Sequence, residues 1–527
     1  MLLYGALSGP LPKLGVVAVA ALVAVVMLHR DARIQAVAML AALVLSPVLL
    51  LAAIWHSPQL GVVHRHPLLA AVGAVVALVA VVIAALIVER RPALLAGAVL
   101  VALPFRIPIQ AGGTTTNLLV PLYFVVAAGS VGFIFRTLGP GGAPEVDQPA
   151  AAAAAGVPEA DPRAPAAGAA RWLERLLAAY VVLYGLQAAY SPSFQTALQN
   201  MVFFYVPFAL AYSLLRRVDW TRRLTRNCLV LIAGLAVLFS LVGFVEYATK
   251  TIFLNPKLIA ANAVHVYFTV NSVFFDPNIF GRFLALVMVL LGAVLLYARR
   301  QRTQLVTLAV LAILWGGLVT TLSRSSMGAL LVGLGVLAAV RWRPGRAVFI
   351  AAGVVALAAA VIAISPTTFG LNQGLNGASS GRPGLVTGGI DLFKSRPLWG
   401  YGSGSFEKEF SARHHALGET TSASHTIPIT IAAEQGLIGE LAYLALVLAA
   451  LVMLLRRARA DPVRVAIAGA FGALVFHTLL YADFLEDPIT WTLLAIGAAL
   501  ARRAPEAPRS AEGDILGHDR TLQQQPA

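Results

Sequence analysis

The sequence predicts an all-α, polytopic transmembrane helical bundle of about 12–15 spans, and three observations predict it. Of the 527 residues, 59% are hydrophobic and 12% are charged, whereas soluble globular chains are about half apolar and a quarter charged. Apolar runs long enough to cross a hydrocarbon core, which takes roughly 20 residues, recur along nearly the whole chain. Every second connection between these runs contains a cluster of Arg, as the positive-inside rule predicts for cytoplasmic connections.

The expected spans follow these apolar runs, and the alternation of basic and uncharged connections orients them. The N-terminus is expected outside and the C-terminus inside, and the short run 93–105 decides the orientation of everything before it. The expected spans are 14–29, 35–54, 68–88, 93–105, 118–135, 173–190, 199–215, 228–247, 279–298, 303–322, 326–340, 347–365, 436–455, 463–482 and 488–501.

Charge and cysteine content exclude several classes of protein. The net charge of +15 does not indicate a nucleic-acid binder, because the basic residues lie in small clusters between apolar runs instead of one patch. Cys228 is the single cysteine, so no intramolecular disulfide is expected. His29, Arg30 and Arg33 follow the first apolar run where a signal peptide would have a small-residue cleavage site, so that run is expected to remain as a span.

The connections divide the chain into segments. The Ala/Pro/Gly-rich stretch 137–171 and the tail 504–527 hold too little bulky apolar surface to offset ordering entropy, so both are expected to be disordered and cytoplasmic. The connections 248–278 and 366–435 are long and extracytoplasmic, and long loops are usually functional. The expected organisation is N-terminal transmembrane helices (1–136), linker (137–171), central helices (172–365), a long extracytoplasmic loop (366–435), C-terminal helices (436–503) and tail (504–527).

Polar motifs gather in the loop 366–435 and at the starts of neighbouring spans. Glycines 400, 402 and 404 suit either tight turns or close approach of backbone amides to a ligand. Ser424-His425-Thr426 stands shortly before a span. The motifs, in chain order, are Asp276 to Arg282, Thr321 to Ser325, Gly381-Arg382, Pro397 to Phe406, His425, and Glu434 to Gly439.

In their order and spacing these motifs resemble the O-antigen ligase and O-antigen polymerase family of membrane glycosyltransferases. In that family a Gly-Arg precedes a Pro-Leu-x-Gly-x-Gly segment, and a His precedes a Glu-x-Gly-Leu-x-Gly helix. The resemblance covers roughly residues 200–480. Thr426 stands where the family usually has Asn, and Val386 where it often has an aromatic residue, and these departures concern substrate detail.

The resemblance implies an enzyme of polysaccharide biosynthesis in the cell envelope. It would transfer a glycan from an undecaprenyl-pyrophosphate-type carrier to a hydroxyl of a saccharide, lipid or protein acceptor, at the extracytoplasmic face of the bacterial inner (plasma) membrane. Ligase and polymerase remain equally open. The implied transfer is inverting, needs no cofactor and is metal-independent, and the sequence has no Asp-x-Asp and no compact His/Asp/Glu ligand set.

Arginine and histidine suit the two chemical needs of such a transfer. The guanidiniums of Arg282 and Arg382 are expected to hold the pyrophosphate, because a planar fork grips phosphate oxygens and stays charged. By resemblance His425 takes the proton of the acceptor hydroxyl, and the ordinary pKa of histidine suits a general base. The residues expected to bind substrate are Arg324, Asn278, Glu434 and Tyr401.

Each arginine also has a structural alternative. Arg282 either holds phosphate or snorkels to the interface or pairs with Asp276. Arg382 could be a solvated loop residue, and Arg324 could brace the neighbouring helices. Arg106 matches no motif and is expected to be structural.

The other candidates have alternatives of the same kind. His425 could begin a helix by bonding to the backbone, and Asn278 could shape the start of its helix as a cap. Glu434 could be purely structural. Tyr401, like other aromatics, either stacks on a sugar or anchors the chain at the membrane interface.

Two other classes of protein remain as alternatives. A transporter of a lipid-linked or anionic substrate would need charges near the midplane of its spans, and only His477 lies there in the expected spans. A non-catalytic polysaccharide assembly protein would tolerate loss of both His425 and Arg282.

Overall fold

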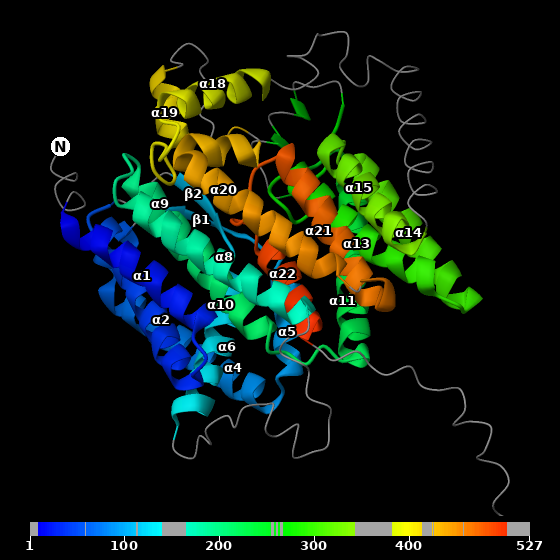
Figure 1. Ribbon diagram of the computed structural model, residues 1–527, viewed down its shortest axis with the longest axis horizontal. Coiled ribbons are helices and arrows are strands. Elements are labelled where there is room, and N and C mark those ends of the chain that lie inside the picture. Colours follow the sequence, from blue (N-terminus) through cyan, green and yellow to red (C-terminus); the bar gives the residue numbers. More distant parts are fainter. Residues whose placement is uncertain are drawn as a thin grey trace, which may run out of the picture.

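The computed structural model describes residues 9–57, 60–111, 114–139, 165–253, 258–259, 262–263, 267–342, 382–413, 424, 426–456 and 458–502 (Figure 1). Within these residues, eleven helices are long and apolar enough to cross a membrane, and two shorter apolar helices accompany them. The prediction of an all-α polytopic bundle is confirmed.

Every expected span except one coincides with described helices. The run 199–215 is formed by α9, a π-helix and α10 together, and the run 347–365 lies outside the described residues. The helices are α1 (Pro10–Leu28), α2 (Ala32–Ile54), α3 (Gly61–Arg65), α4 (Pro67–Arg90), α5 (Ala93–Ala102), α6 (Val120–Leu138), α8 (Pro165–Ala188), α9 (Phe194–Asn200), π-helix η2 (Met201–Tyr205), α10 (Val206–Leu215), α11 (Arg222–Thr249), α13 (Pro277–Tyr297), α14 (Gln301–Thr320), α15 (Arg324–Arg341), α18 (Arg382–Ser395), α19 (Phe406–Arg413), α20 (Ile427–Leu455), 3₁₀-helix η5 (Ala458–Ala460), α21 (Pro462–Leu479) and α22 (Pro488–Arg502).

Aspartate caps mark the starts of several spans. The carboxylates of Asp31, Asp276 and Asp461 each accept a hydrogen bond from the backbone N–H two residues further on, at 2.6–2.9 Å. A proline follows Asp276 and Asp461 at the first helical position, where its missing N–H leaves no hydrogen bond unmade. The short polar connections between apolar runs therefore fix where these helices begin.

Basic connections that are far apart in the sequence meet at one end of the bundle, here called the basic end. Arg216, after α10, has its Nη1 atom 2.7 Å from Oε1 of Glu174 near the start of α8. Arg502, at the end of α22, pairs with the same carboxylate. The Nε of Arg459 donates to the carbonyl oxygen of Val340 at 3.2 Å. The ends of α10 and α22 therefore meet at Glu174, and the end of α15 meets the connection between α20 and α21.

The opposite end of the bundle, here called the cap end, gathers polar connections. It comprises residues 189–193, 250–253, 267–276, 321–323 and 480–487, together with the capping segment (residues 382–413), which contains α18 and α19 and covers the start of α20 (Figure 1). Hydrogen bonds across this end include Gln187 to Gln435 and Asn200 to Glu486.

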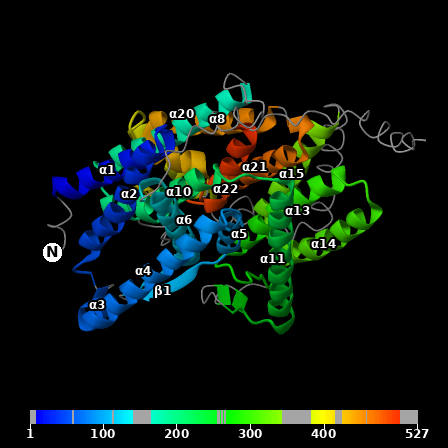
Figure 2. The same ribbon diagram turned by 90° about the horizontal axis from the view of Figure 1, so that it is seen from below.

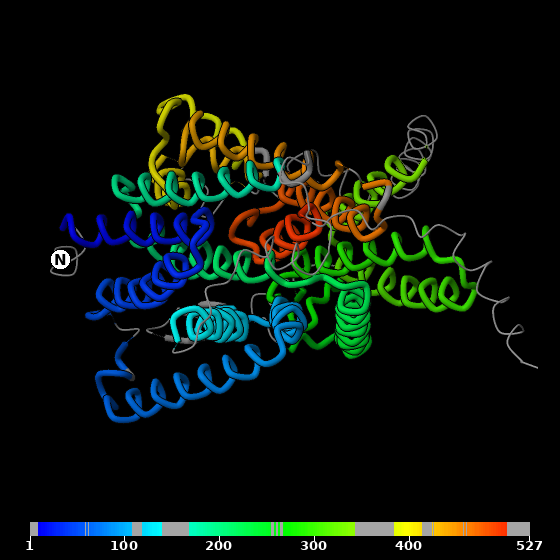
Figure 3. The backbone as a smooth tube through the Cα atoms, turned by 60° about the horizontal axis from the view of Figure 1, so that its bottom comes forward, coloured from blue at the N-terminus to red at the C-terminus, as the bar shows by residue number. Residues whose placement is uncertain are grey.

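Burial distinguishes central from peripheral helices. The short helix α22 lies at the centre of the bundle (Figure 3), and nearly all of its residues are buried. Helix α4 lies along the edge of the bundle (Figure 2), and Ala85 is its one buried residue. Leu68 of α4 is 81% exposed. A helix so apolar and so little covered by protein fits a lipid environment.

A β-hairpin between α5 and α6 was not predicted. Strands β1 (Ile107–Ala111) and β2 (Thr114–Leu118) pair antiparallel, with Ile107 opposite Leu118 and Ala111 opposite Thr114. The segment is rich in Ile and Thr, which favour strands, and Gly112-Gly113 separates the two halves in the sequence.

Segment boundaries also differ from expectation. Within the expected loop 366–435, the capping segment is helical over α18 and α19, and α20 begins at Ile427, before the expected residue 436. Helices α6 and α8 extend into the two ends of the expected linker 137–171, whose residues 140–164 lie outside the described residues. The expected tail 504–527 also lies outside them.

Candidate active site

A buried ion pair at the cap end holds Arg282. This side chain lies one turn inside α13 and is 1% exposed. Its Nη2 atom is 2.7 Å from Oδ2 of Asp487, and its Nη1 atom lies 3.5 Å from the carbonyl oxygen of Asp483. Asp276, the partner considered from the sequence, instead caps α13 through the backbone N–H of Asn278. The guanidinium therefore joins α13 to the connection before α22.

That connection, residues 480–487, is called the acidic loop because it contains Asp483, Glu486 and Asp487 and no Lys or Arg. Burial raises the pKa of Asp487, although Arg282 acts in the opposite direction. Burial, reinforced by Asp483 and Glu434, raises the pKa of Glu486 to about 8, and Arg106 opposes this shift. Carboxyl groups therefore outnumber guanidiniums around Arg282.

A second polar group at the cap end, called the serine cluster, consists of Asn278, Ser323, Ser325, Ser326 and His477. Asn278 Oδ1 accepts a hydrogen bond from Ser323 Oγ at 2.8 Å. The Oγ atoms of Ser325 and Ser326 lie 3.3 and 3.2 Å from Nε2 of His477. Because these residues come from α13, α15 and α21, the cluster fixes three helix ends relative to one another. Asp276, and not Asn278, caps α13, and the Asn278 side chain links α13 to the start of α15.

Arg324 lies at the border of the serine cluster. It is the first residue of α15, and it is exposed while Ser323 and Ser325 on either side are buried. Ser323 caps the helix by accepting a hydrogen bond from the backbone N–H of Ser326. The Arg324 side chain is therefore an exposed cation at the cap end, beside the serine hydroxyls at the start of α15.

Helix α20 is broken at Gly436, where Leu398 and Gly400 of the capping segment pack against its backbone. Gly436 has φ +66° and ψ −163°, which interrupts the helix. A Cβ at Gly436 would collide with the carbonyl of Leu398, and one at Gly400 (φ +68°) would collide with the carbonyl of Glu434. Both positions therefore need glycine. The N–H of Leu437 instead bonds to the carbonyl of Pro397 at 2.7 Å.

The glycine-rich segment binds a carboxylate of the protein itself. Glu434 Oε2 accepts a hydrogen bond from the backbone N–H of Gly404 at 2.8 Å, and Oε1 accepts one from Phe406 at 3.0 Å. The N–H of Gly402 donates to the Glu434 carbonyl at 2.7 Å. Of the two roles considered for these glycines, the structure supports tight turns. The Glu434 side chain holds these turns against α20 through its two hydrogen bonds.

Tyr401 lies in the small core of the capping segment. Its ring is buried with Phe406 and Phe410. Its hydroxyl is 2.8 Å from Ser395 Oγ and also bonds to Arg413. By contrast the neighbouring Trp399 is 58% exposed, so Trp399 is the aromatic of this segment that is available to lipid or sugar.

Two of the three expected catalytic residues have side chains that the structure does not describe. Arg382 is the first residue of α18, and its side chain is among these. His425 lies outside the described residues, between Ser424 and Thr426 at the start of α20. Ser424 Oγ donates to the Thr426 carbonyl at 2.7 Å. The distances among Arg282, Arg382 and His425 therefore remain predictions.

Sequence reasoning missed the acidic loop and the face of α8 that meets it. Asp483, Glu486 and Asp487 were not among the expected site residues, and neither was Gln187. A signal was present, because three carboxyl groups in eight residues without a cation need partners elsewhere. Their partners, Arg282 and Asn200, come from distant parts of the chain.

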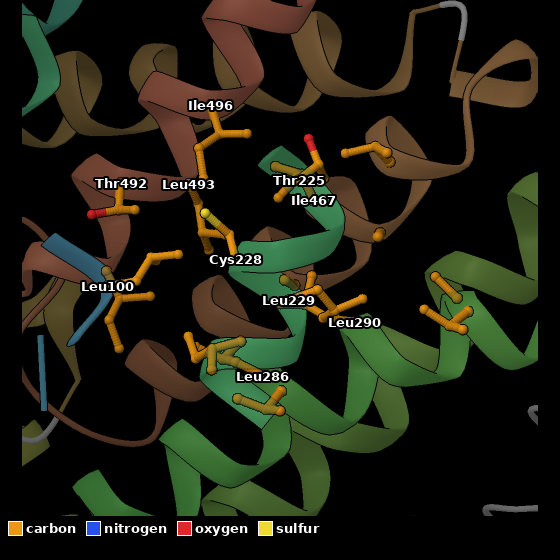
Figure 4. A pocket seen from close by; sticks show the side chains of 18 of the residues that line it. Leu100, Thr225, Cys228, Leu229, Leu286, Leu290, Ile467, Thr492, Leu493 and Ile496 are labelled. Atoms are coloured by element: carbon orange, nitrogen blue, oxygen red, sulfur yellow. The ribbon is translucent and has the colours of Figure 1, made fainter. Parts of the chain in front are cut away.

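An apolar cavity of about 190 Å³ lies inside the bundle, lined by α5, α11, α13, α21 and α22 (Figure 4). Its lining includes Phe283 and Ile489, which are one and two residues from Arg282 and Asp487, respectively. It continues past Cys228 and Leu286 to Tyr297 near the end of α13. The cavity therefore runs along these helices toward the end of α13, and neither Arg282 nor Asp487 is among its lining residues.

Comparison with known protein families identifies the central part of the chain. Residues 308–444 match the family model described as O-antigen ligase. The matched segment runs from α14 to α20, and it includes Arg324, the capping segment and the break at Gly436. No curated protein matches the chain.

Proposed function

Because the match at residues 308–444 supports membership of the O-antigen ligase family, we propose that the protein is a membrane glycosyltransferase. It transfers a glycan from a polyprenyl-pyrophosphate carrier, of the undecaprenyl type, to an acceptor hydroxyl. The observation that carries this proposal is the match itself, which coincides with the capping segment and the broken helix beneath it. The resemblance of the motifs from Asp276 to Gly439 supports the same class.

The proposed chemistry is a single displacement at the anomeric carbon. The acceptor oxygen forms a bond to that carbon while the bond from carbon to the pyrophosphate oxygen breaks, so the configuration inverts and the pyrophosphate leaves with the electron pair. The acceptor proton passes to His425. Arg282 and Arg382 stabilise the charge on the departing pyrophosphate, in place of a divalent cation.

The cavity beneath Arg282 supports a donor that is both anionic and lipidic. A polyprenyl pyrophosphate has an anionic headgroup on a long apolar chain, and such a molecule needs a cation beside an apolar space. Arg282 and the cavity lining at Phe283 are adjacent in the chain. In this proposal the pyrophosphate competes with Asp487 for Arg282, and the first isoprene units enter the cavity.

The remaining residues receive different proposed roles. Arg324, exposed beside the serine cluster, is proposed to bind the donor headgroup or glycan directly. Asn278, Glu434 and Tyr401 are proposed to act by holding the helix ends and the capping segment in place, since their polar atoms bond to other parts of the chain. The cap end would face the outside of the bacterial plasma membrane, because the basic end carries the arginine clusters.

A transfer assay with purified protein tests this proposal. The protein in nanodiscs is supplied with a polyprenyl-pyrophosphate oligosaccharide and candidate acceptors, with EDTA and no added metal. A single new conjugate identifies a ligase, and a ladder of products identifies a polymerase. Arg282→Ala and Arg382→Ala should each abolish transfer, whereas Arg299→Ala, an exposed arginine at the basic end, should not.

Other outcomes would favour the alternatives. Flux of a lipid-linked or anionic substrate in sealed vesicles, unchanged by Arg382→Ala, would indicate a transporter. Glycan output in cells that is unaffected by His425→Ala and Arg282→Ala would indicate a non-catalytic assembly protein. A requirement for a divalent ion would contradict the proposed role of the arginines.

A further inference from the structure

Glu486 is a partly buried carboxyl at the cap end that the proposed transfer does not use. Its Oε1 atom accepts a hydrogen bond from Nδ2 of Asn200, at the end of α9, at 3.0 Å. Asp483 and Asp487, on either side of it in the acidic loop, both contact Arg282. Glu486 therefore lies next to the guanidinium that is proposed to hold the pyrophosphate, while its hydrogen bond is to an amide.

An unsatisfied hydroxyl lies in the same place. Tyr184 of α8 is 2% exposed, and its hydroxyl lies beside the Asn200 side chain. Within the described part of the chain this hydroxyl has no hydrogen-bond partner of normal geometry. A buried tyrosine hydroxyl usually has one, so a hydrogen-bonding group from outside the chain would satisfy it.

The backbone around this site is also irregular. Asn200 is followed directly by the π-helix η2, which is five residues long and separates α9 from α10. The ring of Tyr205, the last residue of η2, lies 4.3 Å from that of Tyr184. Single π-helical turns inside α-helices occur frequently at functional sites. Here the turn begins directly after Asn200 and ends at Tyr205, and both of these residues lie near Tyr184.

We propose that Glu486, Asn200 and Tyr184 form a saccharide-binding subsite, which receives the sugar attached to the pyrophosphate held at Arg282. This inference rests on the proposed function and adds the position of the first donor sugar. A carboxyl, an amide and a phenol together both donate and accept hydrogen bonds, as the adjacent hydroxyls of a pyranose require. Contact with the acidic loop would bring that sugar next to Arg282, where its bond to the phosphate breaks.

A structural or cation-binding role fits these groups less well. Glu486 forms no ion pair within the described residues and feels Arg106 only at longer range, whereas the structural carboxylate of Glu174 pairs directly with Arg216 and Arg502. A divalent cation would need oxygen atoms directed at it, but Asn200 presents its NH₂ group to Glu486. A neutral ligand with hydroxyl groups satisfies both Glu486 and Tyr184.

Binding of two lipids distinguishes the subsite from the phosphate site. The probes are a polyprenyl-pyrophosphate oligosaccharide and the same polyprenyl pyrophosphate without sugar, each titrated against the full-length protein in nanodiscs. Tyr184→Phe should weaken binding of the sugar-bearing probe about 3- to 10-fold, because one hydrogen bond is lost. Glu486→Gln should likewise weaken it about 3- to 10-fold, because one hydrogen bond is lost. Neither change should alter binding of the sugar-free probe.

Tyr184→Phe is the decisive variant, because it removes a hydroxyl that has no described partner within the protein and should leave the melting temperature unchanged. Tyr212→Phe is the matched control, since its hydroxyl bonds to Glu174 at the basic end, and it should bind both probes as the wild type does. Equal binding of both probes by Tyr184→Phe and the wild type would overturn the subsite, as would equal weakening of both.

The same assay separates failure of the subsite from failure of the proposed function. If the wild type transfers glycan but Tyr184→Phe and Glu486→Gln bind and transfer as it does, the subsite alone is wrong. If the wild type binds neither probe and transfers nothing, the proposed function is wrong and the subsite falls with it.

Discussion

The two ends of the bundle each bury an ion pair, and the charge balance of these pairs is opposite. At the basic end one carboxylate, Glu174, meets two guanidiniums, those of Arg216 and Arg502. At the cap end one guanidinium, Arg282, meets Asp487, with the Glu486 carboxyl in the same loop.

The difference indicates which end is built only to hold helices together. A carboxylate enclosed by two cations is fully compensated, and its contacts join α8, α10 and α22. At the cap end the carboxyl groups exceed the cations, and Glu486 and Tyr184 have hydrogen-bonding capacity in excess of their partners. Uncompensated buried groups reduce stability, so their presence is better explained by a ligand than by folding.

The largest expected effect comes from breaking the pair at the cap end. Arg282→Ala leaves Asp487 buried without a cation, and the free energy of unfolding should fall by about 3–5 kcal/mol. The double variant Arg282→Met/Asp487→Asn removes both charges and keeps an oxygen to cap α22, so it should recover most of this loss. Chemical unfolding in detergent micelles measures both. Equal stability of Arg282→Ala and the wild type would show that the pair does not form.

The matching change at the basic end should affect stability alone. Glu174→Ala leaves two arginines without their carboxylate, and the free energy of unfolding should fall by about 3 kcal/mol, because Arg502 is partly solvated. Turnover per folded molecule should stay at the wild-type value. A change in the KM for the donor would contradict the division of roles between the two ends.

A smaller loss is expected from Glu434, which fastens the capping segment. Glu434→Ala leaves the N–H groups of Gly404 and Phe406 without their acceptor, at a cost of about 2 kcal/mol. Limited proteolysis should then cut the capping segment faster. Glu407→Ala, on exposed α19 surface, is the control and should be cut at the wild-type rate. Equal rates for both variants would mean that Glu434 does not hold this segment.

The smallest effect is a pH dependence of stability. The folded protein raises the pKa of Glu486 from 4.5 to about 8, so the folded state holds this proton more tightly than the unfolded state. The resulting stability is fully present below about pH 4.5 and is lost as the pH rises through 8. Glu486→Gln should therefore flatten the fall in melting temperature between about pH 5 and 8. An unchanged pH profile would show that Glu486 titrates normally.

The sequence predicted the helices better than the polar contacts between them. Apolar runs and basic connections were sufficient to locate α1 to α22, because lipid imposes length and charge rules on each span separately. The break in α20 was visible only as a glycine at the expected start of a span. Its cause, the carbonyl of Leu398 lying against Gly436, depends on a segment almost forty residues earlier.

For the site residues too, the sequence indicated single residues but not the partners that they contact. Arg282 was expected from its position at the start of a span, but its partner Asp487 belongs to another connection, and local sequence gives no rule for that pairing. Substrate binding by Asn278 stays a prediction, and its hydrogen bond with Ser323 could not be predicted from the sequence. The Tyr184 hydroxyl could not be singled out, because its significance lies in a missing partner.

The most direct test of the account is glycan transfer by Arg282→Met/Asp487→Asn in nanodiscs, measured beside the wild type. This variant should fold and insert like the wild type, because no charge is left uncompensated. If the cap end holds a polyprenyl pyrophosphate through Arg282, its turnover should fall by about 100-fold or more. Turnover within a few-fold of the wild type, at equal folded protein, would contradict the claim that this guanidinium stabilises the departing pyrophosphate.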